Sequence, residues 1–171
     1  DHGAMAASLA ALASVYQLTG ETNKVESCLE KARHHLQDIG DVLAAARMRF
    51  QLADFFFLEG SYKEAVGHYE KSLPALEEGD GLLAARAHSR MGQCFLDLGE
   101  YAPAENHLEM AKEIMQVLGD LGSVADLLIM LAGNYRRQNR LDEALQCSRQ
   151  CLEIRERRED PVAVADAYSC M

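Results

Sequence analysis

Apolar and polar residues follow the 3.6-residue period of amphipathic helices along most of the chain, and glycines interrupt the pattern at regular distances. The pattern predicts four pairs of helices, near residues 4–19, 22–38, 42–58, 62–77, 81–98, 102–118, 121–138 and 142–158. A further helical pattern begins at Pro161. Because every connection is short, neighbouring helices are expected to run antiparallel. The sequence therefore predicts an all-α chain.

The same features return about every 40 residues. Aromatic residues recur at spacings of 40, 39 and 40, at Tyr16, Phe56, Phe95 and Tyr135. A predicted helix stop follows each of them, at Gly20, Gly60, Gly99 and Gln138-Asn139, because Gly and Asn best adopt the left-handed conformation that ends a helix. Gly-Asp pairs are predicted to end one repeat and cap the next helix, at 40–41, 79–80 and 119–120. The chain thus divides into repeats near 4–40, 41–79, 80–119 and 120–159, with part of a fifth at 160–171.

Small residues accompany the aromatic ones. One lies three positions before each ring, at Ala13, Ala53, Gly92 and Ala132, and the second helices carry Val25, Ala65, Ala104 and Ala144. In these features the chain resembles the tetratricopeptide repeat (TPR) family. The common TPR has about 34 residues, and the longer repeat here resembles those of the Pins/LGN spindle-orientation proteins and of kinesin light chains. The resemblance implies a single solenoid over residues 1–171, in which helical hairpins stack into a right-handed α-α superhelix.

The first helix of each repeat carries a stripe that is expected to be buried. Its members are Ser8, Leu12, Ala13, Tyr16; Met48, Leu52, Ala53, Phe56; Ala87, Met91, Gly92, Phe95; Leu127, Leu131, Ala132 and Tyr135. Pro74 lies inside a predicted second helix. Because proline removes a backbone hydrogen bond, it is expected to bend or interrupt that helix.

Charge and composition narrow the range of partners. The net charge is −10 without any run of Lys or Arg, so nucleic acids and anionic membranes are disfavoured. No apolar run approaches about 18 residues, and no signal peptide is visible. Five cysteines, an odd number, without a signal sequence fit a reducing, cytoplasmic compartment. Residues 1–5 resemble an expression scar, and the chain is expected to be a fragment of a larger protein.

No pattern typical of catalysis, cofactor binding or metal binding is present. The sequence contains no Gly-rich phosphate loop, serine nucleophile elbow or HExxH motif. Cys147 and Cys151 lie four residues apart, but zinc sites combine ligands from separate segments, so these thiols are expected in the core. His34 and His35 are expected to stabilise the C-terminal end of a helix. The sequence therefore predicts no catalytic residue, no cofactor and no metal.

One set of polar residues lies beside the buried stripe on the first helices. It comprises Arg47, Gln51, Asp54, Arg86, Arg90, Gln93, Asp97, Asn134 and Arg137. In the TPR family the corresponding positions bind extended peptides, which implies a peptide-binding groove on the concave side. Arginine suits this role because its planar guanidinium pairs bidentately with carboxylates, so the expected ligand is extended and partly acidic. The competing interpretation is that these arginines are ordinary surface residues or pair with Asp54 and Asp97.

Two functional classes follow. The favoured one is a non-catalytic scaffold or adaptor that binds a peptide or helix of a partner protein in the groove, because aligned arginines stand out in a chain of net charge −10. The alternative is a rigid structural or oligomerisation arm of a larger protein whose functional domain lies outside this chain. Homo-oligomers formed through the solenoid ends or the groove are compatible with either class.

Overall fold

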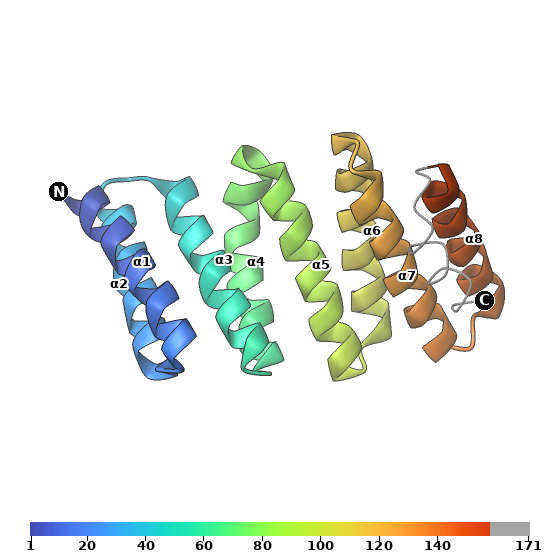
Figure 1. The fold of residues 1–171 in the computed structure, drawn as a ribbon, viewed down its shortest axis with the longest axis horizontal. Helices are drawn as coiled ribbons and strands as arrows, with labels where there is room; N and C mark the ends of the chain where they lie inside the picture. Colours follow the sequence, from blue (N-terminus) through green and yellow to red (C-terminus); the bar gives the residue numbers. More distant parts are fainter. Residues whose placement is uncertain (158–171) are drawn as a thin grey trace. The chain divides into compact units, whose positions relative to one another are not determined.

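The structure, a computed structural model, describes residues 1–157 as a series of helices without a strand (Figure 1). The helices are α1 (His2–Thr19), α2 (Thr22–Asp38), α3 (Val42–Leu58), α4 (Tyr62–Gly79), α5 (Gly81–Leu98), α6 (Tyr101–Leu118), α7 (Leu121–Arg137) and α8 (Leu141–Arg157). Every end lies within two residues of its predicted position. The all-α repeat fold is therefore confirmed for the described residues, and the helix expected from Pro161 lies outside them.

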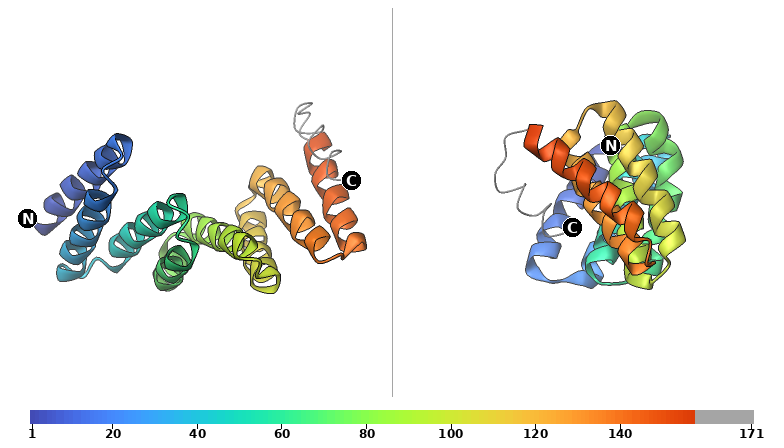
Figure 2. Two further views of the ribbon diagram at one scale, coloured as in Figure 1. Left: turned by 90° about the horizontal axis from the view of Figure 1, so that it is seen from below. Right: turned by 90° about the vertical axis from the view of Figure 1, so that its right-hand side faces the viewer.

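The chain divides into two compact units, residues 1–87 and residues 88–171, with the boundary inside α5. We call them the N-terminal unit and the C-terminal unit. In the N-terminal unit α1 pairs with α2, α3 pairs with α4, and α2 packs against α3. In the C-terminal unit α7 pairs with α8, and α6 packs against α7. The antiparallel course of the paired helices is visible in Figure 2.

The predicted helix stops are present. Gly20, Gly60 and Gly99 have φ values of 75°, 76° and 78°. In the fourth repeat Asn139 takes the same role with φ 60°, and it is the one non-glycine residue with positive φ among residues 1–157. These residues end their helices because glycine, and next best asparagine, adopts the left-handed conformation at low cost.

The predicted aspartate caps are also present. The carboxylates of Asp41, Asp80 and Asp120 accept hydrogen bonds from the backbone N–H groups three residues later, at 2.9, 3.2 and 3.2 Å. Gly79, which precedes one of them, was expected to release the helix but is its last helical residue. A Cβ there would lie 2.9 Å from Leu43 Cδ2, so the glycine gives the Leu43 side chain of α3 room against the end of α4.

The buried stripe is confirmed in the second, third and fourth repeats, where each member is buried or half-buried. In the first repeat the prediction is wrong for Ser8 and Leu12, which are exposed, Leu12 by 42%. There Ala6 and Ala13 are buried, and Leu9 packs between them and the next helices. These side chains are exposed because no other helix of the described residues covers the outer face of α1.

Pro74 does not interrupt α4, which continues to Gly79. Proline leaves carbonyl groups of the preceding turn without their usual helical donors. One carbonyl of that turn, Lys71 O, accepts a hydrogen bond from Arg49 Nη1 of α3 at 3.2 Å. The neighbouring helix thus supplies a donor next to the defect, which compensates part of its cost.

Close approach of paired helices is clearest where α5 meets α6. Gly92 and Leu108 are both buried, and a Cβ on Gly92 would lie 2.7 Å from Leu108 Cγ and Cδ2. Such a distance is shorter than real Cβ contacts, so any side chain here would displace the buried Leu108 or its helix. The small residue of this repeat is therefore required by packing.

We predict that Gly92→Ala destabilises the protein by about 1–3 kcal/mol through this clash. The matched control is Gly67→Ala in α4, where no atom lies within 4 Å of the added Cβ. The control should stabilise by about 0.5–1 kcal/mol, because alanine costs less backbone entropy than glycine in a helix. Chemical denaturation measures both changes, and effects of the same sign would contradict the packing described here.

Candidate functional site

The predicted groove residues lie on the first helices of the second, third and fourth repeats, α3, α5 and α7. The N-terminal unit contains Arg47, Gln51, Asp54 and Arg86. Three of these four side chains are exposed, and Asp54 is half-buried. The C-terminal unit contains the remaining five, which are described separately below.

Arg47 is held by an acidic partner. Its Nη2 lies 2.9 Å from Asp80 Oδ2, and its Nε donates to the same oxygen at 3.1 Å. Asp80 also caps α5 through the N–H of Leu83. Arg47 therefore joins α3 to the start of α5. The competing interpretation, in which the arginines pair with acidic residues, applies to Arg47, but its partner is Asp80 and not Asp54 or Asp97.

Arg86 has a different environment. Its guanidinium lies over the ring of Phe50, with Cζ 5.6 Å from the centroid. Among residues 1–157 no carboxylate lies within 4 Å of it. Cation–π contact orients a guanidinium without neutralising its charge. Arg86 thus presents a positioned, exposed positive charge on the N-terminal unit.

Asp54 serves the core rather than the surface. Its carboxylate accepts a hydrogen bond from the hydroxyl of Tyr69, a residue with 0% exposure. A buried hydroxyl without an acceptor would be costly, so this bond stabilises the α3–α4 pair. Gln51 is exposed on the same helix.

In the C-terminal unit the α5 residues remain at the surface. Arg90 and Gln93 are half-buried, and Arg90 Nη1 donates to Gln93 Oε1 at 3.0 Å. Asp97 is exposed. Arg137, which is exposed on α7, donates from Nη1 to the carbonyl of Leu96 at 3.1 Å. This bond brings Arg137 next to α5.

Asn134 is not at the surface. It has 0% exposure, and its Nδ2 donates to the carbonyl of Tyr101 at 3.1 Å. Its Oδ1 is buried without a hydrogen-bond partner among the described residues. A side chain in this position joins α7 to the start of α6 and cannot reach a peptide, so Asn134 is structural.

Two histidines that the sequence left without a role form a pair, in which His88 is buried and His107 is half-buried. His88 is 1% exposed, and its Nδ1 lies 2.9 Å from Nδ1 of His107. The His107 ring also stacks on Phe95, with centroids 5.5 Å apart. Burial, and then the neighbouring His88, lowers the pKa of His107 to about 4. The available signal was that both residues lie on the facing helices of one predicted hairpin.

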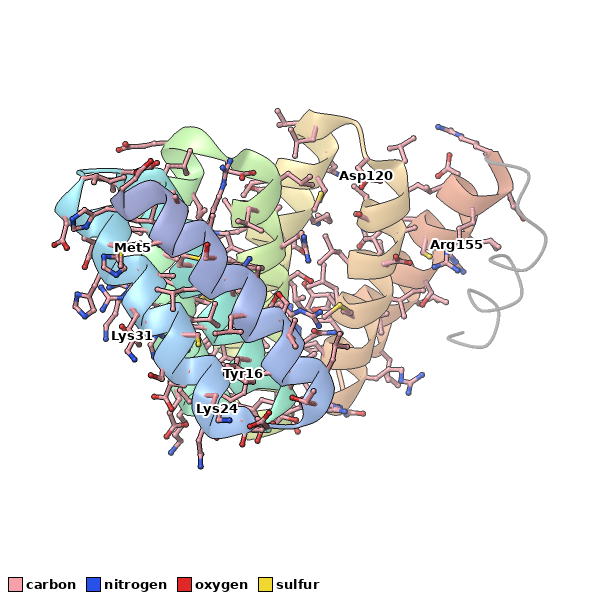
Figure 3. All side chains as sticks on the ribbon, turned by 60° about the vertical axis from the view of Figure 1, so that its left-hand side comes forward. Met5, Tyr16, Lys24, Lys31, Asp120 and Arg155 are labelled. Carbon is pink, nitrogen blue, oxygen red and sulfur yellow. The ribbon has the colours of Figure 1, made fainter. Side chains whose placement is uncertain are left out.

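A second unpredicted cluster joins α6 to the α7–α8 turn. Tyr135 Oη donates to Glu105 Oε1 at 3.0 Å, and Arg140 Nη1 lies 2.6 Å from Glu105 Oε2. The Arg140 guanidinium also covers the Tyr135 ring. Burial, then the hydrogen bond to Glu105, raises the pKa of Tyr135, so the hydroxyl stays protonated as a donor. In the first repeat Lys24 lies over the Tyr16 ring, and Figure 3 labels the two neighbouring residues.

The described residues contain one group with metal-ligand character. His2, His35 and Asp38 bring potential ligand atoms within 4.8 Å of one another. The two imidazoles are already within hydrogen-bond distance, Nδ1 to Nδ1 at 3.2 Å, so their geometry needs no ion.

The cysteines in the described residues are core thiols. The four of them, Cys28, Cys94, Cys147 and Cys151, are buried and form no disulfide, and Cys170 lies outside the described part of the chain. Burial raises the pKa of Cys147, which keeps that thiol protonated and weakens it as a ligand or nucleophile.

Comparison with known proteins supports the repeat interpretation. The sequence model of the tetratricopeptide repeat matches residues 41–116 and, in a second overlapping match, residues 83–157. Together the two matches cover well over half of the chain. The chain belongs to the tetratricopeptide repeat family. TPR proteins generally act as non-catalytic scaffolds in protein–protein interaction, and the repeat fold found here supports that general role.

A curated relative and two solved structures are similar to this TPR chain. Sperm-associated antigen 1 of Mus musculus is 34% identical over 98 residues, 57% of this chain and 10% of the relative. The apo form of RapI matches with a TM-score of 0.82 at 23% identity, over 94% of this chain and 59% of RapI. A candidate kinesin light chain from Podosopora anserina matches with a TM-score of 0.73 at 18% identity, over 90% of this chain and 76% of the other. The two structures support the fold alone.

No helix in the described part of this TPR chain has the length and apolar character needed to cross a membrane.

Acidification should destabilise the protein through His107. Its folded-state pKa of about 4 lies below the ordinary value of about 6.5, so between these values the unfolded state binds a proton that the folded state does not. Stability should therefore fall as the pH is lowered through this window, by about 1–2 kcal/mol after allowance for partial exposure.

The test compares urea denaturation of the wild type and His107→Gln at pH 7, 5.5 and 4.5. Glutamine has an amide group that can hydrogen-bond to His88 but does not titrate, and the carboxylates common to both proteins cancel in the difference. The variant should lose less stability than the wild type on acidification. Parallel pH profiles would show that His107 is protonated equally in the folded and unfolded states.

Proposed function

We propose that this TPR chain is a non-catalytic adaptor that binds an extended, partly acidic peptide of a partner protein through the first helices of its repeats. The observation that carries the proposal is the position of two arginines on α5 and the exposure of one of them. Arg86 and Arg90 lie four residues apart on one helix, so they share a helix face. Arg86 is exposed without a carboxylate partner among residues 1–157, in a chain of net charge −10.

The chemistry of these side chains supports a peptide ligand. A guanidinium offers a planar set of donors that matches a carboxylate or two main-chain carbonyls. Gln51 on α3 and Gln93 on α5 add amide groups that donate to and accept from a peptide backbone. Asp97 on α5 and the Asp80-bound Arg47 limit the net positive charge. We therefore expect a ligand that is extended and partly acidic rather than uniformly anionic.

Two of the nine sequence-predicted residues are outside this proposed surface. Asn134 is buried, and Asp54 accepts the hydrogen bond of buried Tyr69. Arg137 stays in the proposed surface, where its bond to the Leu96 carbonyl orients its guanidinium. The buried thiols are consistent with the reducing, cytoplasmic location that we expect for such an adaptor.

One observation favours the alternative, a structural or oligomerisation arm. The outer side of α1 exposes apolar side chains, including Met5 at 49%, Leu12 at 42% and Val15 at 53%. Exposed apolar side chains on one helix are suited to contact with another protein surface. This contact would use α1 and would leave the α5 arginines available.

The experiment measures binding of a library of extended 12-residue peptides that differ in their content of Asp and Glu. We expect acidic peptides to be selected by the wild type, and Arg86→Ala/Arg90→Ala to weaken the best of them by about 10²–10⁴-fold, because charged hydrogen bonds contribute about 1.5–3 kcal/mol each. Calorimetry at two salt concentrations should show weaker binding at the higher one.

The matched control is Arg149→Ala/Arg157→Ala, which removes two exposed arginines from α8 with the same change in net charge. It should leave the affinity of the selected peptide within about twofold. If no peptide binds the wild type, or if both double variants bind alike, the groove proposal fails and the arm becomes the better explanation.

A further inference from the structure

A pocket of about 160 Å³ lies in the N-terminal unit between α2, α3 and α4. Three basic residues line it, Arg33, Arg49 and Lys71, together with Ala45, Ala46 and Ala75. No acidic side chain is among its lining residues. The combination is unusual in a chain of net charge −10 and is independent of the groove residues described above.

Arg49 lines the pocket from α3 and is half-buried. Its one hydrogen bond in the described part of the chain runs to the Lys71 carbonyl, at 3.2 Å, and no carboxylate lies within 4 Å of it there. A guanidinium carries five N–H donors, so most of its hydrogen-bonding capacity remains available. Burial, and then the charge of Arg33, lowers the pKa of Arg49, although a guanidinium remains protonated at any ordinary pH.

The other two cations differ in how far they are neutralised. Arg33 pairs with Glu30 through Nε at 3.0 Å and donates from Nη1 to Gln37 at 2.6 Å. Lys71 has no carboxylate within 4 Å in residues 1–157. The charges of the pocket therefore sum to about two positive units after the Glu30 pair. The same charges act on His68. Burial lowers the pKa of His68, Glu30 raises it, and the three cations of the pocket lower it again.

The walls of the pocket define the kind of anion that fits. Ala45 and Ala46 are buried, Ala75 is half-buried, and all three line the same pocket as Arg49. The volume is close to that of a cavity of roughly 150 Å³ which accepts benzene in another protein. A bare inorganic anion would leave the apolar wall without contact, whereas a carboxylate on a short aliphatic stem contacts both surfaces.

We propose that this pocket is a binding site for a carboxylate carried on a short aliphatic stem, as presented by a glutamate side chain of a partner protein or by a free dicarboxylate. Arg49 holds the carboxylate, Lys71 adds charge at the rim, and the alanine methyl groups contact the stem. The proposal is independent of the groove. Arg49 follows Arg47 by two residues, which places it about 200° around α3.

The test is an NMR titration of the ¹⁵N-labelled chain with glutarate, with sodium chloride adjusted to keep the ionic strength constant. We expect saturable shifts in the amides of Ala45, Ala46 and Arg49. Inorganic phosphate and a Glu-containing hexapeptide serve as parallel probes. Saturation by the peptide alone would identify a protein side chain as the source of the carboxylate, and saturation by glutarate would show that a free dicarboxylate suffices.

Three variants distinguish specific binding in the pocket from nonspecific electrostatic attraction of anions. Lys71→Gln should weaken glutarate binding at least about tenfold, whereas Lys63→Gln, an exposed lysine on the same helix, should leave it unchanged. Ala75→Leu fills the pocket without a change of charge and should abolish saturation. Circular dichroism confirms that each variant is folded.

The proposal is overturned by linear, non-saturating shifts with both carboxylate probes, or by equal effects of Lys71→Gln and Lys63→Gln. Binding that phosphate matches and that Ala75→Leu leaves intact would also overturn it, because the apolar wall would then play no part. The groove double variant Arg86→Ala/Arg90→Ala should bind glutarate normally, so failure of either proposal can be told from failure of the other.

Discussion

The fold depends on how closely the two helices of a repeat can approach each other. Gly92 leaves no space for a methyl group beside Leu108, and the corresponding second-helix residues Ala65 and Ala104 have 0% exposure. Small residues bring the helix axes together, and the neighbouring aromatic ring fills the space that this approach leaves at the end of the pair. Because the two helices of every hairpin pack in the same way, the same residue types recur every 39 or 40 positions.

This constraint is local, and for that reason most of the fold could be predicted from the sequence. Left-handed stops and aspartate caps act within one helical turn, so the helix ends could be placed within two residues. The errors arose where a distant neighbour decides the outcome. Leu12 has the right spacing for the core but lies on a face of α1 that no described helix covers, and Gly79 lies in the last turn of α4 against the side chain of Leu43 rather than in a turn after the helix.

The candidate site was less predictable because its chemistry depends on partners distant in sequence. Helical periodicity predicts that Arg47 and Arg86 are exposed, as they are, but it cannot show that Asp80, 33 residues away, neutralises the first of them or that the second lies over the ring of Phe50. Asn134 shows a second limit. Adjacent residues differ by about 100° around a helix, so a residue next to an exposed position can lie in the core, as Asn134 does.

Helix α3 shows how one element carries charge on two sides with different consequences. On one side Arg47 is neutralised by Asp80 and contributes to structure. On the other, Arg49 gives one hydrogen bond to a carbonyl in the turn before Pro74, and this places a guanidinium without a carboxylate partner against apolar walls. An exposed charge such as Arg86 is screened by salt, whereas a partly buried charge such as Arg49 is screened less. Under the two proposals, the groove arginines would therefore recognise an extended chain in a salt-sensitive way, and the pocket would recognise a single carboxylate with less sensitivity to salt.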